Sequence, residues 1–295
     1  MSVGLNADSA FGIIPDVKIT NIQKYIMGKR LFHDTNLSKD KKISCSSCHD
    51  LDRYGTDNKI SFQGTENIVG KLNSPTIFNT KFNIAQDGAG RASTIKDRTK
   101  ISFLAQDEMG GNVRKLIQYI YSDPILYDDF IDIYGDVTGD KIFDSIAYFV
   151  ENLLTPNSKF DKFLKGDKSV LNNSEMEGYH LFKKYGCSSC HNGLNIGGNM
   201  YQKLGVFSDF EDNDDNSLGR YTVTGKEYDK NVFKVPSLRN IAKTAPYLHD
   251  GSIPNLKKTI YEMGKLQVGI EISDKDILKI ESFLKTLTGE ITNEY

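Results

Sequence analysis

The sequence contains no tryptophan, and no apolar run in it approaches the roughly 18 residues that a membrane-spanning helix needs. Neither sign of charge is in clear excess, because 37 basic and 39 acidic residues leave a net charge of −2. This balance calls for neither a nucleic acid nor a membrane surface as a partner. The opening stretch, MSVGLNADSAFG, lacks the basic and apolar regions of a secretory signal. The 295 residues suffice for one large domain or two ordinary ones.

Cysteine is scarce, and its placement is informative. The chain has four cysteines, and all of them lie in two copies of the pentapeptide CSSCH, at 45–49 and 187–191. A disulfide framework would scatter its cysteines among loops. A Cys₄ zinc site usually separates its two halves by about 15–20 residues, whereas Cys45 and Cys187 are 142 residues apart. Thioredoxin-like C-x-x-C motifs are a third option, but neither copy lies in a clear βαβ pattern.

Histidine follows the second cysteine in both copies, although the chain has only five histidines. C-x-x-C-H is the attachment motif of c-type haem. Two thiols at this spacing can form thioethers with two vinyl groups on one porphyrin edge, and the adjacent histidine can ligate the iron. We therefore expect two covalent haems, one held by Cys45, Cys48 and His49, the other by Cys187, Cys190 and His191. Covalent attachment occurs outside the bacterial cytoplasm, so we expect a periplasmic protein whose signal peptide is absent from this chain.

Helical periodicity dominates the rest of the chain, and little of it resembles strand. Apolar residues recur at helical spacing in six segments: 16–32, 113–121, 125–135, 139–154, 172–186 and 273–289. Ser273 and Asp276 resemble a capping box, and Gly289 suits a helix end. A helix precedes each CSSCH, and long loops and further helices follow it. The pattern predicts a mainly α fold of two cytochrome c-like domains, 1–160 and 161–295, each with one covalently bound c-type haem.

An acidic stretch at 209–217 partly imitates a calcium-binding loop. Asp212, Asp214 and Asn216 match its start, but Ser217 and Val223 stand where glycine and glutamate are wanted. This stretch is expected to be a solvated surface loop.

The sixth iron ligand would separate the roles of the two haems. A methionine there raises the potential and favours electron transfer, whereas an open position allows chemistry. Met263 lies 72 residues past His191 and is the candidate for the second haem. Met109 lies 60 residues past His49 and is the candidate that spacing gives for the first haem. The neighbouring Glu108 suggests instead a general acid/base beside an open iron. Spacing alone leaves this alternative open.

A longer series of segments resembles the bacterial di-haem cytochrome c peroxidase family, which includes the MauG-type enzymes. In order, the matching segments are GKRLFHDTNLS, SCSSCHD, NSPTIFN, GRAST, EMG, LTPNSKFDKFLKGD, KVPSLRN, APYLHDGS and MGKLQVG. The resemblance covers nearly the whole chain. It implies a peroxidatic haem in the amino-terminal half and an electron-entry haem, ligated by Met263, in the carboxy-terminal half. It also implies that Glu108 is the distal acid/base and that Met109 is a packing residue.

The resemblance further implies a calcium ion between the haems. Its ligands would be the side chain of Asn73 and the backbone carbonyls of Thr244 and Pro246, and calcium takes oxygen ligands of this kind. A homodimer is also implied.

Two departures from the family pattern concern the haems. Members that need reductive activation carry a histidine in the loop before NSPT, and here that position is Thr65. No histidine lies between residues 50 and 179, so the first haem is expected to have a vacant or water-bound sixth position at rest. The tryptophan that the family places between the haems is replaced by Gly88. Electron transfer between the haems would then follow another route, for which an aromatic such as Tyr54 or Phe82 is a candidate.

A third departure is Arg98, which stands where the family has a distal glutamine. Its guanidinium could stabilise the negative charge that develops as an O–O bond breaks. Alternatively, Arg98 pairs with a haem propionate or with a nearby carboxylate.

The other three histidines are not expected to ligate iron. His33 occupies a position where the family has an aromatic, which favours packing. His180 is expected at the surface, and His249 is expected to support the second haem site.

Three functions are compatible with these features. The first is reduction of hydrogen peroxide to water by electrons from a small cytochrome c or cupredoxin, with Glu108 and Arg98 at the peroxidatic haem. The second is a MauG-like oxidase of a protein or organic substrate. That subgroup replaces the methionine ligand with tyrosine, so Met263 argues against it. The third is a plain electron carrier in which Met109 ligates the first haem.

Overall fold

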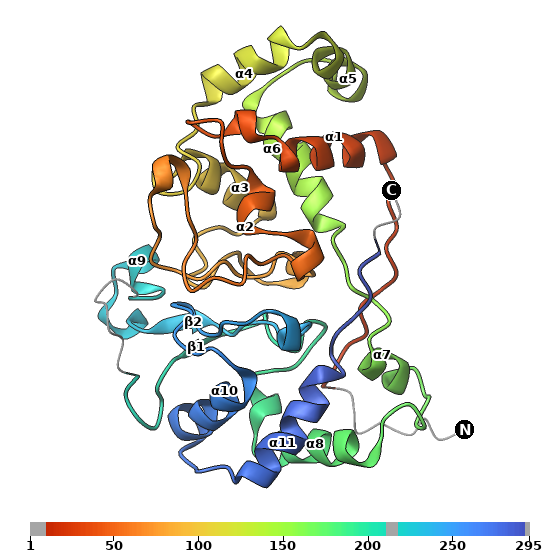
Figure 1. Ribbon diagram of the computed structural model, residues 1–295, viewed down its shortest axis with the longest axis vertical. Coiled ribbons are helices and arrows are strands. Elements are labelled where there is room, and N and C mark those ends of the chain that lie inside the picture. Colours follow the sequence, from red (N-terminus) through yellow and green to blue (C-terminus); the bar gives the residue numbers. More distant parts are fainter. Residues whose placement is uncertain (1–9, 211–217, 293–295) are drawn as a thin grey trace.

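The computed structural model describes residues 10–210 and 218–292, which form two predominantly helical lobes (Figure 1). Within these residues the only strands are β1 (Tyr201–Lys203) and β2 (Val232–Lys234), an antiparallel pair between the lobes. No helix in the described ranges is long and apolar enough to cross a membrane. The prediction of a mainly helical chain is confirmed. Asp212, Asp214 and Asn216 of the calcium-loop-like stretch lie outside the described residues.

The first lobe is built around the crossing of α1 (Ile22–His33) and α6 (Gly139–Glu151). Gly28 lies at this crossing, where a Cβ would overlap the backbone carbonyl of Ser145. The absence of a side chain therefore lets the two helix backbones approach closely. The remaining helices of this lobe are α2 (Cys45–Cys48), α3 (Ile95–Leu104), α4 (Val113–Ser122) and α5 (Pro124–Tyr134).

The second lobe repeats this arrangement with α8 (Asn173–Lys184) and α11 (Asp274–Lys285). Gly178 occupies the crossing, where a Cβ would overlap the carbonyl of Lys279. In each lobe one CSSCH copy follows the first helix of the crossing pair. The other helices here are α7 (Lys159–Leu164), α9 (Tyr221–Thr224) and α10 (Leu256–Met263), which runs into a π-helical turn, Gly264–Val268.

Short 3-10 turns connect these helices and shape the loops. They are Thr35–Leu37, Leu51–Arg53, Thr65–Asn67, Thr80–Phe82, Cys187–Ser189, Glu227–Asp229 and Ile241–Lys243.

Two separate hydrophobic cores lie in the two lobes, and the chain ends cross between them. The first core runs from Tyr25 to Leu153, and the second collects residues from Phe160 onward. Phe11, however, packs in the second core, and Ile291 packs against the first. Figure 1 shows the two terminal segments crossing beside the linker between the lobes. Each lobe is thus partly covered by the far end of the chain.

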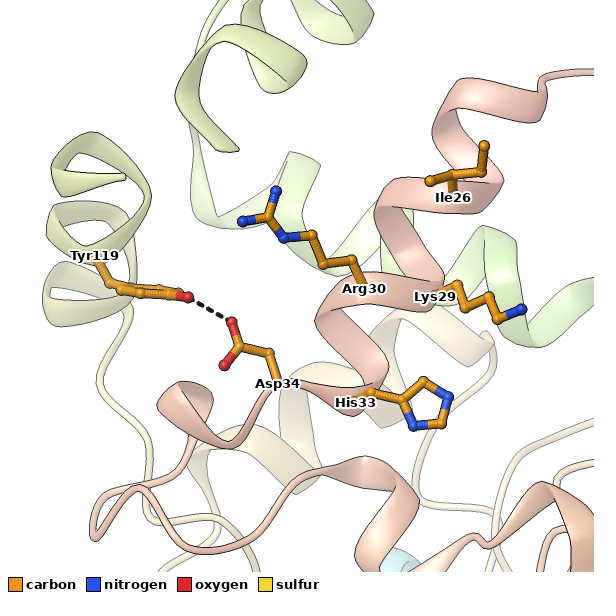
Figure 2. A pocket seen from close by; sticks show the side chains of 6 residues that line it. All are labelled: Ile26, Lys29, Arg30, His33, Asp34 and Tyr119. Atoms are coloured by element: carbon orange, nitrogen blue, oxygen red, sulfur yellow. Dashed lines mark hydrogen bonds between the residues drawn. The ribbon is translucent and has the colours of Figure 1, made fainter. Parts of the chain in front are cut away.

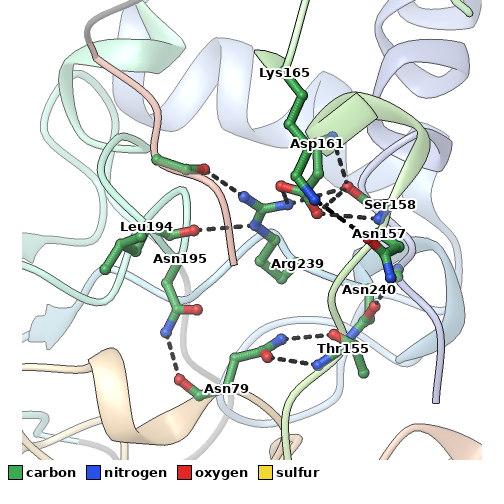
Figure 3. A network of polar contacts seen from close by, with 12 residues as sticks. Asn79, Thr155, Asn157, Ser158, Asp161, Lys165, Leu194, Asn195, Arg239 and Asn240 are labelled. Atoms are coloured by element: carbon green, nitrogen blue, oxygen red, sulfur yellow. Dashed lines mark hydrogen bonds and ion pairs between the residues drawn. The ribbon is translucent and has the colours of Figure 1, made fainter. Parts of the chain in front are cut away.

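A buried ion pair holds this crossing together (Figure 3). Arg239 is 1% exposed and donates to the fully buried carboxylate of Asp161 at 2.8 Å. The same guanidinium donates to the carbonyl of Gly12 at 2.7 Å and to that of Leu194 at 3.0 Å. One side chain therefore ties together the amino-terminal segment, α7 and the loop after the second CSSCH.

Amide side chains join the first lobe to the same region. Asn79 donates to Thr155 Oγ1 at 2.8 Å and accepts from Thr155 N at 2.9 Å. Asn195 donates to the carbonyl of Asn79 at 2.9 Å, and Asn240 donates to Thr155 Oγ1 at 2.9 Å. These bonds are buried, so they fix the linker against both lobes.

All six expected helices exist, and the two largest differences are at the start of one and the end of another. The helix expected over 16–32 begins only at Ile22, because Asn21 caps it by accepting from Lys24 N. The helix expected over 273–289 begins after Ser273, whose side chain caps it, but it ends at Lys285. Gly289 as its stop was wrong, since this residue packs against the backbone of the linker instead.

Candidate functional site

Each CSSCH copy forms one tight turn that places its histidine in the same way. The backbone N–H of His49 donates to the carbonyl of Cys45 at 3.0 Å, and His191 makes the same bond to Cys187 at 3.0 Å. The first copy forms α2, whereas the second forms a 3-10 turn. Both turns bring the two cysteines and the histidine of a motif to one place, as haem attachment requires.

Both histidines are oriented by a backbone carbonyl. His49 Nδ1 lies 3.1 Å from the carbonyl oxygen of Gly55, and His191 Nδ1 lies 3.3 Å from that of Ile196. An Nδ1–H bond of this kind fixes the tautomer and leaves Nε2 as the metal-ligating nitrogen. Burial lowers the pKa of both rings, that of His191 to about 4, which keeps them neutral. The two rings therefore fit the role of iron ligands.

The four thiols are free and only partly exposed. Burial raises the pKa of Cys45 to about 12 and that of Cys48 to about 11. Among the buried side-chain atoms without a hydrogen-bond partner in the described ranges are Asp57 Oδ2, eight residues past His49, and Asn195 Oδ1, four past His191. Both atoms are acceptors, so each can still accept a hydrogen bond from a donor that the described residues do not supply.

Charge distinguishes the two motifs. Burial is the main cause of the raised pKa of the Cys45 and Cys48 thiols and of the lowered pKa of His49. The charge of Glu108 adds to the rise for the thiols, and the charge of Arg98 adds to the fall for His49. The pKa of His191, in contrast, is set by burial and by backbone carbonyls alone. A carboxylate and a guanidinium thus act on the first motif, whereas no charged side chain contributes to the pKa of His191.

Arg98 and Glu108 are brought together by α3 and the loop after it. Arg98 lies on α3, and its Nη2 is 3.0 Å from Glu108 Oε1. Arg98 also donates to Ser102 one turn later, and its Nε lies 3.6 Å from Asp87 Oδ2. The alternative in which Arg98 pairs with a carboxylate therefore holds, and the partner is the proposed acid/base itself. Ser102 and Asp87 were missed by the sequence reasoning, because nothing in their local pattern marks them.

The charge state of Glu108 follows from two opposing effects. Burial raises the pKa of this carboxyl, but the charge of Arg98 and hydrogen bonds from Ser102 and Arg98 outweigh burial. The net pKa is lowered, so Glu108 is ionised at neutral pH and can accept a proton.

Thr65 lies directly against the loop that carries Glu108. Its side chain is fully buried, and its N–H donates to the carbonyl of Glu108 at 2.7 Å. At the preceding Gly64, a Cβ would overlap the carbonyl of Asp107. Lys39 N donates to the carbonyl of Met109 at 2.9 Å. The segment in which the family resemblance would place a histidine therefore fixes the backbone of Glu108 here.

The two candidate methionines differ in their surroundings. Met109 is buried in the first hydrophobic core, which agrees with a packing role. Met263 is the last residue of α10 and is partly exposed at the start of the π-helical turn.

The segments expected to hold calcium meet at the boundary of the lobes. Asn73 N donates to the carbonyl of His249 at 2.8 Å, and Asn73 Nδ2 donates to the carbonyl of Lys59 at 2.6 Å. The side-chain oxygen of Asn73 is thus left to accept or ligate, beside the loop that carries Thr244 and Pro246. In the described residues no group of three or more His, Cys, Asp or Glu side chains could hold a metal, so a site here depends on amide and carbonyl oxygens.

The place of the missing tryptophan is bordered by aromatics of the second lobe. A Cβ on Gly88 would meet the ring of Phe233 at 3.7 Å. Phe233 in turn stacks on His249, with ring centroids 4.4 Å apart. The ring of Tyr54, in contrast, lies beside that of Phe78 inside the first lobe, with the ring centroids 6.4 Å apart. The pair of Phe233 and His249 was not foreseen, because it depends on how β2 meets the first lobe.

A hollow on the outer face of the first lobe lies between α1 and α4 (Figure 2). It is lined by Ile26, Lys29, Arg30, His33, Asp34 and Tyr119, and Tyr119 donates to Asp34 at 2.7 Å. His33 is exposed at its edge, so the expectation that it packs was wrong. His180 is exposed, as expected.

Comparison with known proteins gives one consistent result. A family model described as di-haem cytochrome c peroxidase matches residues 22–169. The cytochrome c551 peroxidase of Nitrosomonas europaea is 45% identical over 266 residues, which cover 90% of this chain and 79% of the relative. The cytochrome c peroxidase Ccp of Escherichia coli is 39% identical over 283 residues, covering 95% and 61%. Among solved structures, a MauG-like protein associated with microbial copper homeostasis superposes with a TM-score of 0.86 at 25% identity, covering 96% of both chains.

Proposed function

Because the chain belongs to the di-haem cytochrome c peroxidase family, we propose that it reduces hydrogen peroxide to water with electrons from a small redox protein. The observation that carries this proposal is the difference between the two CSSCH sites. The first has an ionised carboxylate and a guanidinium beside it, and the second has neither. One site therefore suits proton chemistry and the other suits electron transfer.

The residues of each motif fit one covalent haem. Cys45, Cys48 and His49 would hold the first, and Cys187, Cys190 and His191 the second, in domains that we place at 1–160 and 161–295. When bound, these groups supply an iron at which peroxide can bind and a store for the electrons.

Glu108 moves the proton. Reduction of one peroxide consumes two electrons and two protons and yields two waters. The ionised carboxylate of Glu108 can take the proton from one peroxide oxygen and give it to the other, which then leaves as water. Arg98 supplies positive charge where negative charge develops as the O–O bond breaks. Ser102 accepts a hydrogen bond from Arg98 and so orients the guanidinium.

Met263 is assigned to the second site as the ligand that makes it an electron-transfer centre. Electrons from a cytochrome c or cupredoxin would enter there. Its position at the end of α10, partly exposed, is compatible with entry from the surface.

Thr65 supports a first site that is open at rest. A threonine offers no imidazole, and no histidine lies between residues 50 and 179. The enzyme is therefore proposed to bind peroxide without prior reduction.

Calcium, location and assembly complete the proposal. Asn73, Thr244 and Pro246 would hold one calcium ion through oxygen atoms. A periplasmic location follows from covalent haem attachment, and the family resemblance suggests a homodimer.

The MauG-like oxidase is less supported. Three relatives named cytochrome c peroxidase or cytochrome c551 peroxidase are 35–45% identical to this chain, and three more peroxidases are 27–29% identical. Two relatives named MauG are 25–26% identical.

The proposal is tested on the purified protein carrying both haems. Peroxide should oxidise a reduced small cytochrome or cupredoxin catalytically. The electron paramagnetic resonance spectrum of the ferric protein should contain a high-spin component before any reduction. Two low-spin haems together with no peroxide consumption would instead indicate an electron carrier.

A further inference from the structure

Lys234, the last residue of β2, is a buried lysine at the boundary of the two lobes. It is 9% exposed, and within the described residues its Nζ makes no hydrogen bond or ion pair. Its backbone N–H donates to the carbonyl of Gly88 at 2.8 Å, so the end of the strand is docked on a loop of the first lobe. Figure 1 shows β2 at this boundary.

The charges around Lys234 are already matched without it. Asp87 pairs with Arg91 at 2.8 Å and lies 3.6 Å from Arg98 Nε, and Glu108 pairs with Arg98 at 3.0 Å. Two carboxylates thus face two guanidinium groups, and Lys234 is the surplus cation.

An isolated ammonium in such a place is unfavourable. Burial lowers the pKa of Lys234 to about 8, and the carboxylate of Asp87 only partly opposes this effect. A buried cation is normally paired with an anion. The anion that would match Lys234 is absent from the described part of the chain, which indicates that it belongs to a bound group.

We propose that Lys234 Nζ binds a carboxylate of the covalent cofactor, a propionate of one of the two haems. The position agrees with this, because both attachment sites adjoin the same boundary. Two residues after Lys234, the carbonyl of Pro236 acts on the ring of His191. On the other side, Asp87 shares Arg98 with Glu108. A permanently attached carboxylate would also explain a permanently buried lysine. This inference rests on the two haems of the proposed function.

The test compares Lys234→Met with Lys203→Met in the protein carrying both haems. Lys203 is an exposed lysine of β1 in the same two-stranded sheet and serves as the matched control. The readouts are the midpoint potential of each haem and the thermal unfolding midpoint. A cation near a haem favours the added electron, so its loss should lower the potential of one haem. It should also lower the unfolding midpoint, because the propionate then loses its partner.

Lys203→Met should leave both quantities unchanged, and Lys234→Arg, which keeps the charge, should restore the potential. If Lys234→Met leaves both potentials unchanged, and the unfolding midpoint unchanged or higher, the proposal is wrong, since removing an unpaired buried charge stabilises a protein. Should the methionine variant fail to accumulate with both haems, Lys234→Gln takes its place in the same measurements.

A second arm separates a propionate from an exchangeable anion. The wild-type potentials are measured in chloride, acetate and phosphate at one ionic strength. A propionate predicts no dependence on the anion, whereas a clear dependence would assign Lys234 to a free anion and overturn the proposal. Haem stoichiometry and peroxide turnover of the wild type are recorded separately. A protein with two haems and normal turnover but indifferent to Lys234→Met refutes this inference alone.

Discussion

Arg98 holds the carboxylate of Glu108 through one nitrogen, with Nη2 3.0 Å from Oε1 and 3.2 Å from Oε2. The pair joins a residue of α3 to the loop that follows this helix, beside the first CSSCH. Because the guanidinium keeps the carboxylate ionised in a largely buried place, proton transfer and charge stabilisation would depend on one contact.

Replacing Glu108 by glutamine should abolish most peroxide turnover. Glutamine keeps the shape but cannot accept a proton, and general acid–base catalysis contributes about 10²–10⁴-fold. The measurement is kcat/KM for peroxide at equal haem content. Asp107→Asn is the control, since Asp107 is the exposed neighbour in the same loop, and it should retain turnover. Wild-type turnover in Glu108→Gln would remove Glu108 from the mechanism.

Replacing Arg98 by methionine should shift the pH profile. Burial would then act on Glu108 without the opposing charge, and its pKa would rise. Since the ionised carboxylate is the active form, activity is lost as pH falls through this pKa, and the acid limb of kcat/KM should move to higher pH. Arg114→Met, at an exposed position of α4, should leave the limb in place. An unmoved limb in Arg98→Met would show that Arg98 does not tune Glu108.

Replacing Met263 by leucine should impair electron entry. Loss of the thioether ligand should lower the potential of the second haem, because methionine ligation raises it. Turnover with the donor protein should fall, while the high-spin signal of the first haem stays. Met176→Leu makes the same exchange against the second hydrophobic core and should change neither quantity. An unchanged second potential in Met263→Leu would assign the ligand elsewhere.

Much of the fold could be predicted from the sequence, because helical periodicity is a local signal. The segments 113–121 and 125–135 became α4 and α5 within a residue at each end. The start of α1 was misplaced by six residues, since Thr20 N and Asn21 N donate to Tyr148 Oη on α6, and Asn21 caps the helix. The contact with Tyr148 depends on a distant residue, and no local pattern reports it.

The candidate site shows the same limit. The CSSCH motifs reveal their chemistry locally, and both histidines have the carbonyl partner that a ligand needs. The pairing of Arg98 with Glu108 could not be predicted, because it depends on how the chain turns after α3. The isolation of Lys234 could not be predicted either, because it depends on the contact between β2 and the first lobe. Sequence indicates which residue types are available, whereas burial and charge balance appear only when distant segments meet.

Gly64→Ala should displace the acid/base loop. The backbone of Gly64 suits any residue, with φ −86°, so the effect is steric: the added Cβ would overlap the carbonyl of Asp107. We expect a loss of about 1–3 kcal/mol in the free energy of unfolding and a fall in kcat, because Thr65 N would lose its alignment with Glu108. Gly88→Ala is the control, since its Cβ would make an ordinary 3.7 Å contact. Equal effects in both variants would contradict this reading of the loop.

Asp161→Asn should destabilise the whole molecule. Its carboxylate is fully buried and accepts from Arg239 Nη1 at 2.8 Å and from Ser158 Oγ at 2.7 Å. The neutral amide would leave the guanidinium buried and uncompensated, which costs about 3–5 kcal/mol when one partner of a buried pair is removed. Because Arg239 also holds Gly12, the amino-terminal segment should become accessible to protease.

Unfolding in guanidinium chloride measures the loss of stability in Asp161→Asn, and limited proteolysis measures the exposure of the amino-terminal segment. Glu177→Gln is the matched control, since Glu177 pairs with Lys279 at the surface of the second lobe, where solvent screens the charges. Its unfolding midpoint should stay close to that of the wild type. If Asp161→Asn behaves like Glu177→Gln, the ion pair of Arg239 contributes no more than a surface contact, and the crossing of the termini must be held by its hydrophobic contacts through Phe11.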